Sequence, residues 1–255
     1  MKRTLVIGDI HGGLIALKQV LDRATVTRED HLIFLGDYVD GWSDSVNVVD
    51  FLIELSQQQE VTLIRGNHDN LVYQWLKGKE MSPKWIQHGG QSTKRAYAKL
   101  SDAEKEAHLP FYERLQDYYI DDQNRMFCHA GFQNLNGPSH EWNSTTFYWD
   151  RTLWEMVCAM REDLTPEDLL YPKRLWLFKE IYIGHTPVTR LGETEPVQKA
   201  NVWNIDTGAA FLGTISVLDV DTKMFWQSDP VWELYPEEKG RNRTSYTASN
   251  AFVKG

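Results

Sequence analysis

The amino-acid sequence predicts an α/β fold in which parallel strands alternate with helices. In the first third of the chain, short apolar runs alternate with longer segments whose apolar residues recur every three or four positions. Five of the apolar runs are followed within a few residues by aspartate, asparagine or histidine. The C-terminal third carries apolar runs broken by Gly and Asp turns, a pattern typical of β-hairpins.

The expected elements follow one another along the chain. Three buried strands are expected first, at residues 4–8, 31–36 and 61–66. An amphipathic helix is expected after each of them, at residues 13–24, 45–59 and 70–78. Strand–helix–strand units of this kind pair in parallel through right-handed crossovers. Residues 80–123 are more polar and are expected to be mostly helical. Two further strands, each ending in histidine, are expected at residues 125–131 and 180–186.

Length and composition limit the classes of protein that the chain can represent. Its 255 residues, 42% of them hydrophobic, predict one domain over residues 1–240 and a polar tail over 241–255. The net charge of −9 argues against a nucleic-acid partner. No apolar run approaches the ~20 residues of a membrane span, so no membrane partner is expected. The short N-terminal apolar run does not match a signal peptide, and the two cysteines imply no disulfide framework. We therefore expect a cytoplasmic protein.

The side chains at the strand ends predict one functional site, because ligands of parallel sheets gather beyond the carboxyl ends of the strands. These side chains are Asp9, His11, Asp37, Asp40, Asn67, His68, His129 and His185. Carboxylate, amide and imidazole groups together suit manganese, iron or zinc. Asp9 and His11 lie two positions apart, so in extended backbone both would point to one side. Even without Asp40 and His68, the remaining six side chains exceed the ligands that one tetrahedral ion needs. They suit two divalent ions that share a carboxylate, a centre whose remaining positive charge would attract phosphate.

Five motifs carry a resemblance to a known family. The segments GDIHG, GDYVDG, RGNHD, CHAG and IGHT occur in that order between residues 4 and 212. They closely resemble the calcineurin-like metallophosphoesterases, and most of all a bacterial branch that includes serine/threonine phosphatases and symmetrical dinucleoside tetraphosphatases. The resemblance implies a metallophosphoesterase fold, in which βαβ-built sheets pack as a sandwich flanked by helices, with C-terminal β-hairpins.

The resemblance also implies a role for each motif residue. Asp9 and His11 resemble ligands of a first divalent ion, and Asp37 resembles a carboxylate that bridges two ions. Asn67, His129 and His185 resemble ligands of the second ion. Manganese is the first expectation for both, with iron or zinc as alternatives. A hydroxide between the ions would attack the phosphorus atom. His68 resembles the general acid that protonates the leaving oxygen, and Asp40 the group that orients its imidazole. Arg151 resembles an arginine that binds the phosphate.

Gly41 departs from the family pattern, which has a phosphate-binding arginine at this position. The loss of a charge-assisted hydrogen bond costs about 1.5–3 kcal/mol. Either another basic group such as Arg151 compensates, or Gly41 and Trp42 widen the pocket for a bulkier substrate.

Three functions remain open from the sequence. The first is hydrolysis of phosphomonoesters, with phosphoserine or phosphothreonine in proteins as the expected substrate and small phosphoesters as further substrates. The alternative is a symmetrical dinucleoside tetraphosphatase, which Asp69 in GNHD weakly favours and which would need additional basic groups near the site. The third is a binding protein without turnover, an idea that Gly41 supports slightly and the intact ligand set opposes.

Overall fold

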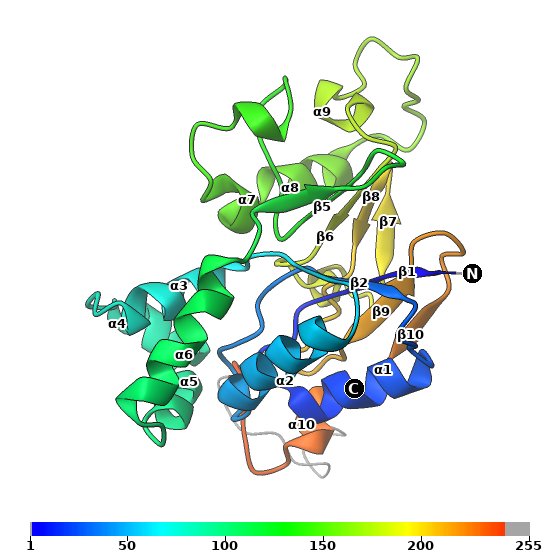
Figure 1. The fold of residues 1–255 in the computed structure, drawn as a ribbon. Coiled ribbons are helices and arrows are strands. Elements are labelled where there is room, and N and C mark those ends of the chain that lie inside the picture. Colours follow the sequence, from blue (N-terminus) through cyan, green and yellow to red (C-terminus); the bar gives the residue numbers. More distant parts are fainter. Residues whose placement is uncertain (1, 243–255) are drawn as a thin grey trace.

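Two five-stranded mixed sheets pack face to face, and helices cover both outer faces, in the computed structural model of the chain (Figure 1). The structure describes residues 2–242. Most of the predicted polar tail, residues 243–255, therefore lies outside the described residues. The two mixed sheets and their flanking helices confirm the predicted α/β sandwich.

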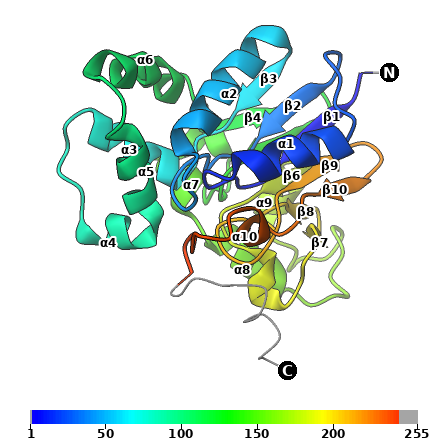
Figure 2. The same cartoon turned by 90° about the horizontal axis from the view of Figure 1, so that it is seen from below.

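The first sheet has the strand order β10–β9–β1–β2–β3. Its strands are β1 (Thr4–Ile7), β2 (His31–Phe34), β3 (Val61–Leu63), β9 (Ser216–Asp219) and β10 (Phe225–Gln227). The first three run parallel, as the sequence predicts, and the antiparallel β9–β10 hairpin extends the sheet next to β1. Helices α1 (Leu14–Arg23) and α2 (Ser45–Gln58) connect the parallel strands. With α10 (Val231–Leu234) they cover the outer face of this sheet (Figure 2).

The second sheet has the order β4–β5–β6–β8–β7. Its strands are β4 (Tyr118–Ile120), β5 (Arg125–Cys128), β6 (Glu180–Ile183), β7 (Val197–Lys199) and β8 (Val202–Asn204). Strands β5, β6 and β8 run parallel. The outer face is covered by α7 (Thr146–Trp149), α8 (Thr152–Ala159) and α9 (Lys173–Trp176).

One segment differs from the expected secondary structure, and another makes an additional strand pairing. Residues 118–120, expected to be helical, form the edge strand β4, which pairs with β5 and satisfies its backbone there. Residues 202–204, expected in a C-terminal hairpin, form β8, which makes an antiparallel hairpin with β7 and also pairs in parallel with β6. The chain then leaves the second sheet after β8 and returns to the first sheet as β9, which forms a second hairpin with β10.

The core between the sheets is formed by side chains of both. Val6, Ile33 and Leu218 of the first sheet meet Phe127 and Tyr182 of the second, and all five are fully buried. The aromatic rings of Phe127 and Tyr182 stack with their centroids 4.9 Å apart. This packing fixes the two sheets relative to each other, so loops from both sheets can form one site.

A group of helices lies beside the first sheet (Figure 1). It comprises α3 (Asn67–Leu76), α4 (Pro83–Trp85), a π-type turn over Ile86–Gly90, α5 (Gln91–Tyr97) and α6 (Asp102–Glu113). Short 3₁₀ turns occur at Pro138–His140 and Val188–Leu191. Within residues 2–242, no helix has the length and apolarity needed to cross a membrane.

Candidate active site

The carboxyl ends of five parallel strands meet at one edge of the sandwich. Asp9 and His11 follow β1, Asp37 follows β2, and Asn67 begins α3 shortly after the end of β3. His129 and His185 follow β5 and β6 of the second sheet. The structure thus places all six predicted ligands in one buried cluster, with contributions from both sheets.

The contacts within this cluster are close. The Nε2 atoms of His11 and His129 lie 3.5 and 3.4 Å from Oδ2 of Asp37. The Oδ1 atom of Asn67 lies 3.1 Å from Nε2 of His129 and 3.0 Å from Nδ1 of His185. Asp37 is therefore the central member, and Asn67 links the two histidines of the second sheet.

Several of these residues have unusual backbone conformations. His11, Asp37, Asp40 and His185 have φ angles of 52°, 54°, 67° and 69°. This left-handed region is disfavoured for residues other than glycine, and such residues tend to gather at functional sites. The extended backbone expected between Asp9 and His11 is therefore wrong. A turn at His11 brings its Nε2 to 3.7 Å from Oδ2 of Asp9 instead.

Backbone carbonyls orient two of the imidazoles. Nδ1 of His11 donates to the carbonyl oxygen of Asp40 at 2.8 Å. Nδ1 of His129 donates to the carbonyl oxygen of Leu35 at 2.8 Å. Because the Nδ1 atom carries the proton in each case, the Nε2 lone pair is free to bind a cation, an arrangement common among metal-binding histidines.

Two overlapping groups of side chains could each hold a metal ion. One is formed by His11, Asp37 and His68, the other by Asp37, His129 and His185. Asp37 belongs to both, so the geometry fits two cations that share one carboxylate. Among the described residues, Oδ2 of Asp9 and Nε2 of His185 are buried without a hydrogen-bond partner. Unpaired buried donors and acceptors are costly, which makes the donor set suited to a cation.

The carboxylates of the cluster also perturb ionisation. Although burial opposes it, Asp37 raises the pKa of His129 to about 10. Burial and the neighbouring Asp9 raise the pKa of Asp206 to about 8. Gly184 allows this crowding, because a Cβ atom there would lie within 2.2 Å of Oδ1 of Asp9. The site therefore concentrates negative charge that divalent cations would neutralise.

His68 and Asp40 form a hydrogen-bonded pair beside the cluster. Nδ1 of His68 lies 2.7 Å from Oδ2 of Asp40, and both residues are buried. Asp40 also accepts hydrogen bonds at 2.6 Å from Nε1 of Trp85 and from Oγ1 of Thr93. Burial lowers the pKa of His68, against the opposing effect of Asp37. Trp85 and Thr93 were not predicted from the sequence, and both come from the polar segment after α3.

Asp69 is a further residue whose role the sequence did not reveal. Its carboxylate accepts backbone N–H bonds from Asp37, Tyr38 and Gly66 at 2.8 to 2.9 Å. Asp69 thus joins the loop that contains Asp37 to the first turn of α3. The spacing of Gly66 and Asp69, an N-cap and its N3 position, is the signal that could have indicated this.

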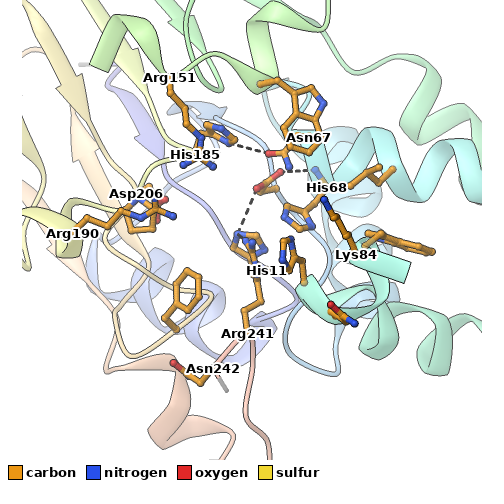
Figure 3. Close-up of a pocket in the computed structure, with 18 of the residues that line it drawn as sticks. His11, Asn67, His68, Lys84, Arg151, His185, Arg190, Asp206, Arg241 and Asn242 are labelled. Atoms are coloured by element: carbon orange, nitrogen blue, oxygen red, sulfur yellow. Dashed lines mark hydrogen bonds and ion pairs between the residues drawn. The ribbon is translucent and has the colours of Figure 1, made fainter. Parts of the chain in front are cut away.

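A cavity of about 1020 Å³ opens over the cluster (Figure 3). Its wall carries five basic side chains, namely Lys84, Arg151, Arg190, Lys239 and Arg241. Burial lowers the pKa of the Arg151 guanidinium, and the charges of Arg190 and Arg241 lower it further. The exposed indole of Trp149 and the ring of Phe211 also line the cavity. This local concentration of positive charge contrasts with the net charge of −9 for the whole chain.

Comparison with known proteins supplies related sequences and folds. Residues 2–204 match the model of the calcineurin-like phosphoesterase family. The asymmetrical bis(5'-nucleosyl)-tetraphosphatase PrpE of Bacillus velezensis is 31% identical over 222 residues, covering 81% of this chain and 84% of its own length. The protein of the same name from Oceanobacillus iheyensis is 26% identical over 238 residues, covering 86% of this chain and 89% of its own length.

A solved structure of a serine/threonine phosphatase from Saccharomyces cerevisiae has a similar fold. It superposes with a TM-score of 0.58 at 13% sequence identity, and the match covers 89% of this chain and 80% of that one.

Proposed function

The chain belongs to the calcineurin-like phosphoesterase family, and we propose that it hydrolyses a phosphoanhydride bond of dinucleoside polyphosphates. The observation that carries the proposal is the cavity of about 1020 Å³ with five cationic side chains. A single phosphoryl group needs few cations, whereas a chain of phosphates needs several. The names of two relatives, both asymmetrical bis(5'-nucleosyl)-tetraphosphatases, support the same substrate class.

We assign the cluster at the strand ends to two divalent cations. Asp9 and His11 would bind the first, Asp37 would bind both, and the second would be bound by Asn67, His129 and His185. Manganese is the first candidate for this mixed oxygen and nitrogen donor set, with iron or zinc as alternatives. When bound, such a pair supplies charge that stabilises the reacting phosphate oxygens and makes the attacking water more acidic.

We assign proton transfer to His68. Its Nδ1 atom pairs with Asp40, so Nε2 is available to donate a proton to the leaving oxygen. As water attacks the phosphorus atom, the bond to the leaving oxygen breaks and that oxygen takes the proton. Asp40, held by Trp85 and Thr93, keeps the imidazole in this orientation. Arg151 on the cavity wall would bind phosphate oxygens.

Trp149 supports a nucleotide substrate. Its side chain lines the cavity and is 46% exposed. An exposed aromatic ring on a cavity wall offers a stacking surface to a nucleobase, and such stacking is worth roughly 1–3 kcal/mol per base. A cavity with both cations and an aromatic surface matches the two chemical parts of a nucleotide.

The competing candidate is hydrolysis of phosphoserine or phosphothreonine in proteins, the substrate that the sequence motifs suggested first. It uses the same cation and acid chemistry at a phosphomonoester. The similar fold of the yeast serine/threonine phosphatase suits this candidate. A phosphoprotein substrate would give no role to the five basic side chains of the cavity or to the exposed ring of Trp149, so we place this candidate second.

A side-by-side assay tests the proposal. The full chain, loaded with Mn²⁺, is given a dinucleoside tetraphosphate, a phosphoserine peptide and an aryl phosphate, and kcat/KM is measured for each. We expect the highest value for the dinucleotide, and we expect Asp37→Ala to lose activity on all three. A higher kcat/KM on the peptide would refute the proposal in favour of a protein substrate. No turnover on any substrate would indicate a binding protein.

The products identify which phosphoanhydride bond is cleaved. The alternative function that the sequence left open was symmetrical cleavage, which yields two nucleoside diphosphates. The names of the two relatives favour asymmetrical cleavage, which yields a nucleoside monophosphate and a nucleoside triphosphate. We propose the asymmetrical outcome, and anion-exchange chromatography of the reaction mixture separates the two sets of products.

A further inference from the structure

Arg241 reaches the candidate metal cluster from the far end of the chain. Its Nη1 atom lies 3.5 Å from Nε2 of His11, a residue 230 positions earlier in the sequence. Figure 3 shows Arg241 and Arg151 approaching the histidines from opposite sides. Arg241 is half-buried, whereas Arg151 and Arg190 are exposed. It is thus the cavity arginine most enclosed by the site.

The guanidinium of Arg241 has an unsatisfied donor. Its Nε atom is buried and has no hydrogen-bond partner within the part of the chain that the structure describes. A buried donor without a partner is unfavourable, and a guanidinium offers its donors in a planar arrangement that matches phosphate oxygens. The side chain therefore has both the position and the free hydrogen-bonding capacity to bind an anion over the cluster.

The loop between β8 and β9 holds Arg241 in place. The backbone N–H of Arg241 donates to the carbonyl oxygen of Ala210 at 2.8 Å. Its guanidinium lies 5.3 Å from the centroid of the Phe211 ring, which is the range of a cation–π contact. The adjacent Ala209 accepts a hydrogen bond from Nε1 of Trp42 at 2.8 Å. The arginine is therefore held before any ligand arrives, which reduces the entropy lost on binding.

Gly41 leaves room for this arrangement. Its φ angle is +135°, and a Cβ atom there would lie 2.9 Å from the carbonyl oxygen of His11. The same Cβ would lie 3.8 Å from Cγ of Arg241. A side chain at position 41 would therefore be strained, and it would begin beside the stem of Arg241. Trp42 is fully buried, so it does not widen the cavity.

We propose that Arg241 binds the phosphoryl group that undergoes hydrolysis and thereby supplies, from the C-terminal segment, the cation that position 41 lacks. The proposal rests on the proposed phosphohydrolase function, but not on the identity of the leaving group. Because the reacting phosphoryl group is common to all substrates, the loss of Arg241 should affect a dinucleotide and a simple aryl phosphate alike.

Calorimetric titration with inorganic phosphate tests this directly. Metal-loaded wild type, Arg241→Ala and Arg241→Lys are compared, with Arg161→Ala as the control for loss of one positive charge. Arg161 is exposed, pairs with Asp163 and does not line the cavity. We expect Arg241→Ala to bind phosphate about 10- to 100-fold more weakly, the range for one charge-assisted hydrogen bond. Arg241→Lys should recover part of this loss, and Arg161→Ala should bind as wild type does.

Metal content and kinetics complete the test. We expect Arg241→Ala to keep its metal content by elemental analysis and to lose kcat/KM equally on aryl phosphate and dinucleotide. Wild-type phosphate affinity in Arg241→Ala would overturn the proposal, and so would a kinetic loss confined to the dinucleotide. If Arg241→Ala loses metal, Arg241→Lys decides: weaker phosphate binding at full metal content supports the proposal, and unchanged binding refutes it.

The test also separates this inference from the proposed function. A wild-type enzyme that ignores dinucleotides but loses aryl phosphatase activity in Arg241→Ala would reject the proposed substrate while keeping the role of Arg241.

Discussion

Nδ1 of His68 donates a hydrogen bond to Oδ2 of Asp40 at 2.7 Å, and Asp40 itself accepts hydrogen bonds from Trp85 and Thr93. The orientation of the proposed acid is thus determined by a carboxylate that has little freedom to move. This relationship makes the contribution of His68 separable from that of the metal ligands.

We expect His68→Ala to lower kcat on an alkyl phosphate about 10²- to 10⁴-fold, the usual contribution of a positioned acid. A leaving group that needs no proton, such as nitrophenolate, should be affected much less. Steady-state kinetics on both substrates measure the difference, and elemental analysis verifies that both metals remain. Equal losses on the two substrates would remove His68 from the role of acid.

Asp37→Ala should abolish binding of both metal ions, because Asp37 is the member shared by the two candidate groups. In contrast, His185→Ala should weaken only one of the two sites, since it belongs to one group. Elemental analysis after dialysis against Mn²⁺ gives the stoichiometry. Two ions per wild-type chain are expected, and a single fully occupied site in wild type would contradict the shared-ligand geometry.

Arg151→Ala should raise KM for the dinucleotide about tenfold, the effect of removing one exposed charge-assisted contact. The effect should shrink as ionic strength rises, because salt screens exposed charges. Initial rates at low and high salt test both statements. An unchanged kcat/KM on every phosphate compound would show that Arg151 does not contact the substrate.

Trp149→Ala should raise KM for a dinucleoside tetraphosphate about 5- to 100-fold, the loss expected for one base–aromatic stack. KM for inorganic pyrophosphate or another phosphate compound without a base should change little. Trp142→Ala serves as the control, since Trp142 is 97% exposed and lies outside the cavity. A uniform effect on substrates with and without a base would argue for a structural role instead.

Asp30 gives a prediction about stability. The buried Asp30 carboxylate accepts from Nε and Nη2 of Arg3 at 3.0 and 2.7 Å. Although burial opposes it, these bonds and that from Thr27 lower the pKa of Asp30 to about 2. A carboxyl pKa lowered by folding stabilises the fold above the unfolded pKa of about 3.9. The stabilisation is lost as the pH falls towards 2.

Asp30→Asn should therefore reduce the free energy of unfolding at pH 7 by about 2 kcal/mol. The difference in the free energy of unfolding between variant and wild type should become smaller as the pH is lowered from 4 to about 2. Urea unfolding at several pH values measures it. The exposed Asp163→Asn is the matched control and should show little change at any pH. A difference that does not vary with pH would indicate that packing, rather than charge, is responsible.

The strands and helices that carry the site residues could be predicted from the sequence. Apolar periodicity and the residue types at strand ends depend only on neighbouring positions in the chain. All three early strands and their helices form within about three residues of the expected bounds, and α3 begins at Asn67 rather than at residue 70. The paired strands then carry Asp37 and His129 from different sheets to within 3.4 Å. Because parallel strands end at the same edge of each sheet, the side chains that follow them meet there.

Other features depend on contacts that no local pattern contains. The left-handed turn at His11 is imposed by the surrounding loops, so alternation along an extended strand gave the wrong geometry. The hydrogen bonds from Trp85 and Thr93 to Asp40 arise from helix packing. Arg241 occurs in a polar stretch without periodicity, and its approach to His11 is visible only in three dimensions.

The proposed ligands come from both sheets, and this division has a thermodynamic consequence. Asp9, His11, Asp37 and Asn67 belong to the first sheet, whereas His129 and His185 belong to the second. Cations bound between them would cross-link two halves of the sandwich that are also joined by apolar packing and by polar contacts such as the hydrogen bond from His129 to the Leu35 carbonyl. By linkage, a ligand present at 100 times its dissociation constant adds about 2.7 kcal/mol to the folded state. The same ions would thus serve as structural clamps, and depletion by a chelator would loosen the interface between the sheets as well as stop turnover.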